Sequence, residues 1–161
     1  MEDARVATNA DLPRVADLAR ELRAHLLTER GGALWSVRES RPEPLESVFA
    51  DFVARDDAAV LVGTLDDHVV GYGVVRIEPV RDGSRLGVIE EIYVEREARA
   101  VGVGERLVEQ LVAFCADAGC VGVDAAALPG DRQAKNFFER AGFTARLLVM
   151  HHGVGKRDEA N

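Results

Sequence analysis

The sequence predicts a mixed α/β fold with a mostly antiparallel sheet of six to seven strands and helices on both faces. Three observations support this prediction: apolar residues recur at helical spacing in four segments, three β-rich runs follow one another in mid-chain, and a strand–helix–strand unit comes after them. Consecutive strands with short turns pair antiparallel, whereas a strand–helix–strand unit makes a parallel pair through a right-handed crossover. We assign residues 1–161 to a single domain, with a core at about 4–151 and a tail at 152–161.

The first third of the chain predicts one strand and two helices. A short strand is expected at residues 4–7. Asp11 offers a capping oxygen and Pro13 suits a first helical turn, so a helix should begin there and end before Gly31. Its inward face would be Leu12, Val15, Leu18, Ala19, Leu22 and Leu26. Pro44 opens a second helix with its own apolar face.

The middle of the chain predicts three strands. Two β-rich runs, residues 58–64 and 68–78, flank a turn at Asp66-Asp67 and indicate a hairpin. A polar loop then leads to LGVIEEIYV, residues 86–94, which predicts the third strand. The remaining elements are expected in this order: a helix at 104–118 stopped by Gly119, a strand at 121–126, a helix that Asp131 caps and Gly142 ends, and a strand at 143–151.

Composition excludes several classes of protein. A net charge of −8 spread along the chain argues against a nucleic-acid partner, which needs a basic face. No window approaches the run of about 20 apolar residues that spans a membrane, and the acidic N-terminus does not resemble a secretory signal. The two cysteines, Cys115 and Cys120, lie in apolar runs and predict buried thiols rather than a disulfide. We therefore expect a cytoplasmic protein.

A glycine-containing loop, Arg99-Ala100-Val101-Gly102-Val103-Gly104, lies between a predicted strand and a predicted helix. Unpaired N–H groups at a helix N-terminus bind anions, and glycine lets phosphate oxygens approach them. Arg99 adds a fixed positive charge. Taken alone, the two glycines favour a mere tight turn into a helix. A dinucleotide loop fits poorly, because Leu107 stands where its third glycine would be.

Two segments resemble the signatures of one family, the GNAT acetyltransferases. IYVEREARAVGVGERLVEQL, residues 92–111, is similar to the family's acetyl-CoA-binding motif, [R/Q]-x-x-G-x-[G/A] entering a helix. AKNFFERAGF, residues 134–143, resembles the second signature, a helix ending in F/Y-F/Y-E-x-x-G-F. With the order of elements, the resemblance covers about residues 4–151.

The resemblance implies an N-acetyltransferase that uses acetyl-CoA as cosubstrate. Backbone amides of residues 99–104 would hold the pyrophosphate, and Ile92, Tyr93 and Val94 would pair with the pantetheine arm as though it were an added strand. The strands at 86–94 and 121–126 would splay apart around the thioester. The acceptor, a primary amine of a small molecule or peptide, would attack directly in a ternary complex.

A base is needed because an amine at neutral pH is mostly ammonium. Glu90 and Glu91 lie inside an apolar strand, where neighbouring residues point to opposite faces, so only one should face the cofactor. Glu90 shares its parity with Ile92 and Val94, and we predict it to be the base. Glu91 and Asp124 are the alternatives.

Two positions depart from the family pattern. Phe138 stands where many members have a tyrosine that protonates the leaving thiolate, so water or another group must do so here. Asp131 replaces an asparagine that helps to hold pantetheine, and we expect it to act as a helix cap. Of the two tyrosines, Tyr72 could line the acceptor site and Tyr93 should pack in the core or against the cofactor.

The acceptor and the assembly stay open. A loop at about residues 27–43, which contains Trp35 and several charged residues, should cover the acceptor pocket. The four histidines show no metal-ligand spacing, and we expect no metal. A homodimer is one option for assembly. The alternative to an enzyme is a module of the same fold that binds acyl-CoA as a sensor or interacts with partners without turnover.

Overall fold

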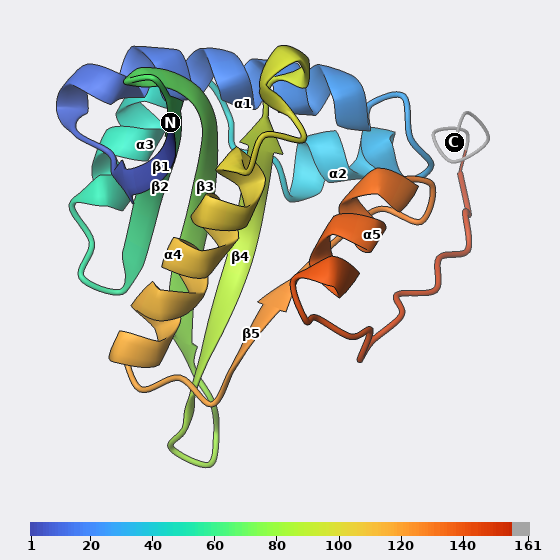
Figure 1. Cartoon of the computed structure of the whole chain (residues 1–161). Helices are drawn as coiled ribbons and strands as arrows, with labels where there is room; N and C mark the ends of the chain where they lie inside the picture. Colours follow the sequence, from blue (N-terminus) through green and yellow to red (C-terminus); the bar gives the residue numbers. More distant parts are fainter. Residues whose placement is uncertain (156–161) are drawn as a thin grey trace. The chain divides into compact units, whose positions relative to one another are not determined.

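A five-stranded mixed sheet organises the computed structural model, which describes residues 1–155. Its strands lie in the order β1-β2-β3-β4-β5 (Figure 1). They are β1 (Glu2–Val6), β2 (Ala58–Leu65), β3 (His68–Pro79), β4 (Arg85–Val94) and β5 (Gly122–Ala125). The first four pair antiparallel, and β5 pairs with β4 in parallel. The predicted mixed, mostly antiparallel sheet is confirmed.

The number of strands is smaller than predicted. The expected strand at residues 143–151 is not one: this segment is irregular, and Leu147, Leu148, Val149 and Met150 are 68–87% exposed. The apolar sequence favours a strand, but β propensity describes a fit to a paired surface. Within residues 1–155 no strand of the sheet pairs with this segment. The sheet therefore has five strands rather than six to seven.

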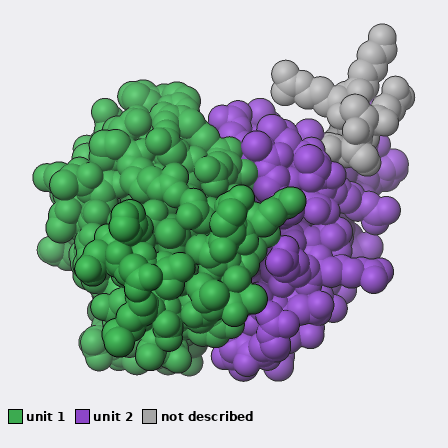
Figure 2. All heavy atoms as spheres, turned by 45° about the horizontal axis from the view of Figure 1, so that its top comes forward, with its two compact units in different colours: residues 1–22, 41–126 green, residues 23–40, 127–161 purple. Residues whose placement is uncertain are grey.

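The described chain divides into two compact units, shown in different colours in Figure 2. Unit 1 consists of Met1–Leu22 and Arg41–Ala126, and it contains the whole sheet. Unit 2 consists of Arg23–Ser40 and Ala127–Asn161, of which residues 156–161 lie outside the described part. The single-domain organisation remains a prediction, as does the tail at 152–161.

Five α-helices and two short 3-10 helices accompany the strands in the described residues, 1–155. They are η1 (Asn9–Asp11), α1 (Leu12–Leu26), α2 (Gly32–Arg38), α3 (Leu45–Val53), η2 (Arg96–Ala98), α4 (Val103–Asp117) and α5 (Arg132–Arg140). All but α2 and the 3-10 helices match predicted helices. The sequence analysis treated the α2 segment, which contains Trp35, as loop. None of the helices within residues 1–155 is both long and apolar enough to cross a membrane.

The helix α4 packs on one face of the sheet because glycines there leave room for it (Figure 1). A Cβ atom added at Gly73 would lie 2.8 Å from Leu111 of α4, and one at Gly87 would lie 2.2 Å from Cys115. Leu111 and Cys115 are fully buried. Burial raises the pKa of Cys115 to about 11, so this thiol stays neutral.

The opposite face of the sheet is covered by α3. Phe49 of α3 meets Tyr72 of β3 edge-on, with ring centroids 6.0 Å apart at 78°, and both side chains are fully buried. Tyr72 and Gly73 are neighbours on β3 and therefore point to opposite faces. Helices cover both faces of the sheet, as predicted.

Local signals set the hairpin and the start of α1. Asp66 and Asp67 both have positive φ, 48° and 67°, which is the conformation of a tight two-residue turn. Before α1, the Asp11 carboxylate accepts from the Thr8 backbone N–H at 2.8 Å and from both terminal nitrogens of Arg5 at 2.7 and 3.0 Å. These bonds lower the pKa of Asp11 to about 2, with the Arg5 guanidinium as the main cause.

Candidate active site

The loop after β4 leads into the N-terminus of α4. Gly102 is the N-cap of α4 with φ of 97°, and Ala100 is left-handed as well, with φ of 66°. The first N–H groups of a helix have no partner within it and carry partial positive charge. Gly102 has no side chain with which to cap this helix. The predicted loop residues, which end with Val103 and Gly104 in the first turn of α4, are thus arranged to receive an anion.

Arg99 places a positive charge at the beginning of this loop. Its Nε donates to the Val94 carbonyl oxygen at 2.9 Å, and its guanidinium lies 5.4 Å from the centroid of the Tyr93 ring. Burial is the main cause that raises the pKa of Tyr93, so its hydroxyl stays protonated at neutral pH. Tyr93 is half-buried and holds Arg99 by ring contact, which agrees with a packing role.

The strand β4 extends beyond its pairing with β5. The two strands pair only from Leu86↔Gly122 to Ile89↔Ala125. Residues 91–94 stay paired with β3 on the other side, but within residues 1–155 no strand pairs with residues 90–94 on the β5 side. An extended ligand can therefore add to this edge through backbone hydrogen bonds. Ile92, Tyr93 and Val94, the predicted partners of pantetheine, lie on this stretch.

A β-bulge interrupts the alternation of side chains on β4. The pairing of β3 and β4 shifts from Val74↔Glu91 to Val75↔Ile89, which leaves Glu90 as the extra residue. A bulge brings two successive residues of one strand toward the same side. Both glutamates accordingly contact the same guanidinium, that of Arg41.

The expectation that Glu90 points to the same face as Ile92 and Val94 is therefore wrong. Gly73, the partner of Ile92, faces α4, so Ile92 lies on the α4 face. Glu91 instead accepts from Tyr72 on the opposite face, and Glu90 lies with it. Glu90 does not share a face with Ile92 and Val94, because the bulge adds one residue between them. Glu90 as the base stays a prediction, without the support of parity.

Arg41 bridges the two glutamates. Its Nη2 donates to Oε2 of Glu90, and its Nη1 donates to Oε2 of Glu91. Its guanidinium also lies 4.7 Å from the ring centroid of Phe52 and 5.6 Å from that of Phe49. Only 10% of its side chain is exposed. Arg41 is thus a buried cation between two carboxylates and two aromatic rings.

The second oxygen of each glutamate has its own donor. The Tyr72 hydroxyl donates to Oε1 of Glu91 at 3.0 Å, and burial raises the pKa of Tyr72 well above its usual range. Arg76 donates from Nε to Oε1 of Glu90 and from Nη1 to Glu78, each at 2.5 Å. Hydrogen bonds from Arg76 to Glu78 and Glu90 raise the pKa of Arg76. Tyr72 is a buried donor here rather than part of an acceptor lining.

Exposure separates the two glutamates. The Glu91 side chain is 6% exposed, whereas that of Glu90 is 26% exposed. A carboxylate has about four lone-pair positions, and the bonds named above use two on Glu90. Glu90 can therefore accept a further proton donor from solvent or ligand. Asp124, the third candidate, lies on β5 opposite Val88.

Arg41 lies in the loop at 27–43 that was expected to cover the acceptor pocket, and Arg76 was not among the predicted site residues. Two adjacent glutamates in an apolar strand do indicate that cations must lie near them, because buried charges need partners. The sequence offers 20 lysines and arginines and does not show which of them reach β4.

Unit 2 contains the two positions that depart from the family pattern. Asp131 is the N-cap of α5, where it accepts from the Ala134 backbone N–H at 3.3 Å, as predicted. Phe138 is 8% exposed and packs between Phe137 and Phe143, with ring centroids 5.5 and 5.3 Å away.

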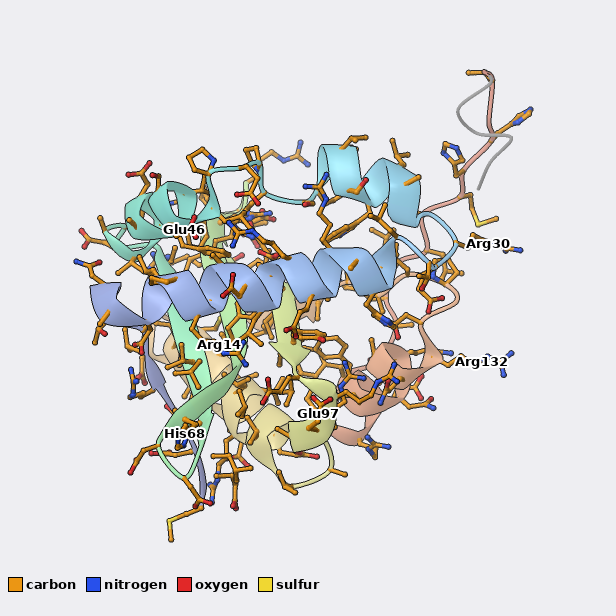
Figure 3. The ribbon with its side chains drawn as sticks, turned by 90° about the horizontal axis from the view of Figure 1, so that it is seen from above. Arg14, Arg30, Glu46, His68, Glu97 and Arg132 are labelled. Carbon is orange, nitrogen blue, oxygen red and sulfur yellow. The ribbon has the colours of Figure 1, made fainter. Side chains whose placement is uncertain are left out.

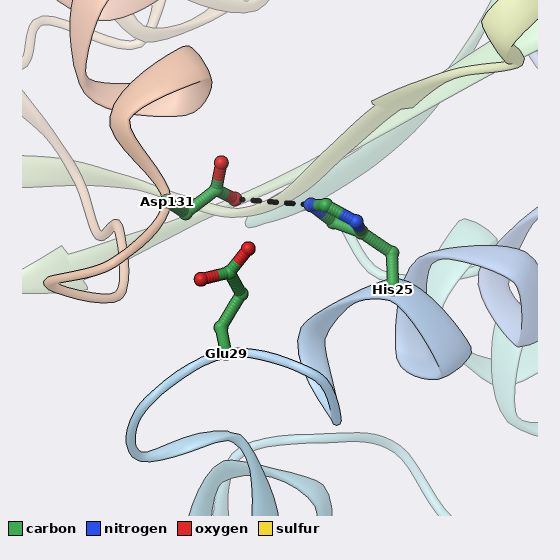
Figure 4. Close-up of side chains that lie close together, drawn as sticks. All are labelled: His25, Glu29 and Asp131. Carbon is green, nitrogen blue, oxygen red and sulfur yellow. Dashed lines mark ion pairs between the residues drawn. The ribbon is translucent and has the colours of Figure 1, made fainter.

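Three side chains that can bind metals meet in unit 2 (Figure 4). They are His25, Glu29 and Asp131, whose potential ligand atoms all lie within 4.8 Å of one another. Nε2 of His25 is 3.6 Å from Oδ2 of Asp131, an ion pair when the imidazole is protonated. Sequence spacing does not reveal this group, because Asp131 is far from His25 and Glu29 in the chain.

A shallow hollow lies in unit 1 beside the hairpin of β2 and β3. Its lining includes Arg14 of α1 and His68 of β3, both labelled in Figure 3. Arg14 donates to the Val69 carbonyl oxygen at 3.1 Å and to Glu95 at 2.5 Å. These bonds tie α1 to β3 and to Glu95, the residue that follows β4.

Comparison with known families establishes the class of protein as an acetyltransferase. Residues 19–143 match the family model described as the acetyltransferase (GNAT) family. The chain therefore belongs to the GNAT family, whose members use acetyl-CoA as cosubstrate. The resemblance in the sequence motifs is confirmed.

Individual relatives differ in the acceptors that their names state. A probable glucosamine 6-phosphate N-acetyltransferase 2 from Oryza sativa is 29% identical over 109 residues, which are 63% of this chain and 64% of that protein. A solved aminoglycoside acetyltransferase from an uncultured soil metagenomic sample has a TM-score of 0.72 at 19% identity, over 96% of this chain and 95% of that one. A ribosomal-protein-alanine N-acetyltransferase from Brucella melitensis has a TM-score of 0.69 at 17% identity, over 96% and 100%. The two structural likenesses show the fold.

Proposed function

We propose that this protein transfers an acetyl group from acetyl-CoA to a primary amine of a small molecule or peptide, by direct attack in a ternary complex. The observation that carries the proposal is the position of Glu90. It is the first residue of β4 after the last pair with β5, Ile89↔Ala125, and its carboxylate is partly exposed. A proton acceptor therefore lies where the open edge of β4 begins.

Residues on the loop and the open edge would bind the cosubstrate. The pyrophosphate would accept from backbone N–H groups at the start of α4, with Arg99 supplying charge at the loop. The pantetheine arm would extend along residues 92–94 as an added strand. The family membership and the shape of the loop support this assignment.

The proposed reaction uses one protein base and water. Glu90 accepts a proton from the acceptor ammonium, and the neutral nitrogen attacks the thioester carbonyl carbon. As the C–S bond breaks, the nitrogen loses its second proton to water and becomes the amide nitrogen. Coenzyme A leaves as a thiolate, which water can protonate because a thiol has a pKa near 8.5. Phe138 has no proton to give, so the protonation is independent of its side chain.

The substitution Glu90→Gln tests the role of this residue. It should lower turnover about 10²-fold or more while acetyl-CoA affinity stays within about twofold. Turnover is followed as thiol release with a panel of amines, and the acetylated product is identified by mass spectrometry. Glu109→Gln is the matched control, because this glutamate of α4 is 60% exposed, pairs with Arg106 and should tolerate the change.

Other results would reassign the role. Normal turnover in Glu90→Gln, with Glu91→Gln or Asp124→Asn inactive, would transfer the base to that residue. Acetyl-CoA binding without thiol release from any amine would favour a sensor or interaction module. The panel should include glucosamine 6-phosphate, an aminoglycoside and a peptide with N-terminal alanine, because relatives carry these acceptors in their names.

We also propose a cytoplasmic protein, in keeping with its two free cysteines, and a homodimer as its assembly. Light scattering behind size-exclusion chromatography measures the molar mass. A mass near 17.5 kDa would show a monomer instead.

A further inference from the structure

Both carboxylates of β4, those of Glu90 and Glu91, form ion pairs with arginines of the protein itself. Arg41 and Arg76 supply two positive charges, and Glu78, Glu90 and Glu91 supply three negative ones. The cluster of these five residues, here called the β4 charge cluster, carries one net negative charge.

One ion pair beside the β4 charge cluster leaves this balance unchanged. Arg55 stacks on the Phe52 ring that Arg41 also contacts, 4.9 Å from its centroid. Its guanidinium is bound to Asp57 through two hydrogen bonds of 2.8 and 3.0 Å. The pair adds no net charge beside the β4 charge cluster.

The net charge of the β4 charge cluster determines how many positive charges of an acceptor it can balance. A monoamine brings one positive charge and loses it as a proton to the base, whereas a polyamine brings further charges that need carboxylates without internal partners. Glu90 and Glu91 would be suited to that purpose, but Arg41 lies between them. It is 10% exposed and held by two rings, so a flexible ligand cannot replace it without opening two ion pairs and two ring contacts.

We propose that Arg41 is a specificity-determining residue that makes this protein selective for monoamine acceptors over polyamines. The proposal rests on the proposed function in one respect, namely that the acceptor amine reaches Glu90. The acceptor class is thereby defined by its charge. Arg41 lies outside both the glycine-containing loop at 99–104 and the open edge of β4.

A matched pair of acceptors tests the proposal. n-Butylamine and putrescine share a four-carbon chain and differ by one additional ammonium group. Arg41→Gln raises the net charge of the β4 charge cluster from one negative charge to two. The putrescine-to-butylamine ratio of kcat/KM should therefore rise about fivefold or more at low ionic strength and fall again in high salt.

Three further variants separate charge from structure. Arg41→Gln combined with Glu91→Gln removes one charge of each sign, so the ratio should return to the wild-type value even though Arg41 is absent. Arg76→Gln removes the other cation, which is 32% exposed, and should raise the ratio if Arg41→Gln fails to fold. Arg5→Gln is the control, because this partly exposed arginine pairs with Asp11, outside the loop at 27–43, and should leave the ratio unchanged.

Equilibrium binding separates this proposal from the proposed function. Isothermal titration of putrescine, with desulfo-CoA present, should show weaker binding to the wild type than to Arg41→Gln, whether or not turnover occurs. An equal putrescine affinity and an equal ratio in folded Arg41→Gln and Arg76→Gln would overturn the role of Arg41. A lack of thiol release in all proteins, together with the expected change in putrescine affinity, would refute the enzyme while leaving the charge selectivity in place.

Discussion

The hydroxyl of Tyr72 is the neutral donor to the buried carboxylate of Glu91, and its removal gives a direct measure of the bulge's stability. Tyr72→Phe deletes one oxygen atom and keeps the ring, which packs against Phe49. The 3.0 Å bond to Oε1 of Glu91 is then lost, while Arg41 still holds Oε2. The substitution therefore tests one hydrogen bond with little change in packing.

The expected magnitude follows from the charge and burial of the acceptor. A hydrogen bond to a charged group contributes about 1.5–3 kcal/mol to stability, and an unsatisfied buried acceptor costs a similar amount. Glu91 is 7% exposed, so solvent cannot easily replace the hydroxyl. We expect Tyr72→Phe to lower the free energy of unfolding by about 2 kcal/mol. For a chain of this size, this corresponds to a fall in Tm of about 4–8 °C.

Urea unfolding followed by circular dichroism checks this expectation. The midpoint should fall with an unchanged slope, because the surface exposed on unfolding stays the same. Tyr93→Phe is the matched control, since the other tyrosine is only half-buried and should cost less. A double-mutant cycle with Glu91→Gln should give a coupling of about 1 kcal/mol or more. A loss below about 0.5 kcal/mol for Tyr72→Phe would show that this bond does not stabilise the bulge.

Four further predictions concern the loop, the N-terminal cap, α5 and metals. Gly104→Asp should weaken acetyl-CoA binding at least about tenfold by calorimetry because a carboxylate would face the pyrophosphate, whereas Gly155→Asp, which points into open space, should not. Asp11→Asn should cost about 1–2 kcal/mol at pH 7 in urea unfolding and much less near pH 2, because a pKa lowered to about 2 stabilises the fold above pH 4 and is lost as pH falls through 2. Phe138→Leu should cost about 1 kcal/mol or somewhat more and leave most turnover intact, so a folded, acetyl-CoA-binding but inactive variant would contradict a packing role. EDTA should not lower thiol release, and a loss that Zn²⁺ restores would overturn the expectation of no metal.

Much of the fold could be predicted because its signals are local. The helix expected at 104–118 lies at Val103–Asp117, since its apolar spacing and the following Gly119 depend on neighbouring residues alone. The turn at Asp66-Asp67 is where the sequence indicated it, because aspartate tolerates positive φ. The loop into α4 was predictable for the same reason: glycines next to a helix start have few structural interpretations.

Other features depend on distant partners and could not be predicted. The bulge on β4 arises from its pairing with β3, and the period-two pattern of Glu90 and Glu91 contains no sign of it. Arg41 belongs to a segment that the sequence indicated only as a charged loop over the acceptor. The apolar run Leu147–Met150 favours a strand, yet strand formation also needs a neighbour that offers its edge. In each case the deciding interaction joins residues far apart in the chain.

The bulge links stability and the proposed chemistry through two adjacent residues with different tasks. Glu91 is buried and held by Arg41 and Tyr72, so it anchors the point at which β4 gains its extra residue. Glu90 is that residue, and it stays partly exposed because the anchor next to it fixes the strand without covering it. An alternating strand would have pointed Glu90 and Glu91 to opposite faces, where one guanidinium could not bridge them. Substitutions at Glu91 should therefore change unfolding first and turnover second, and substitutions at Glu90 should do the reverse.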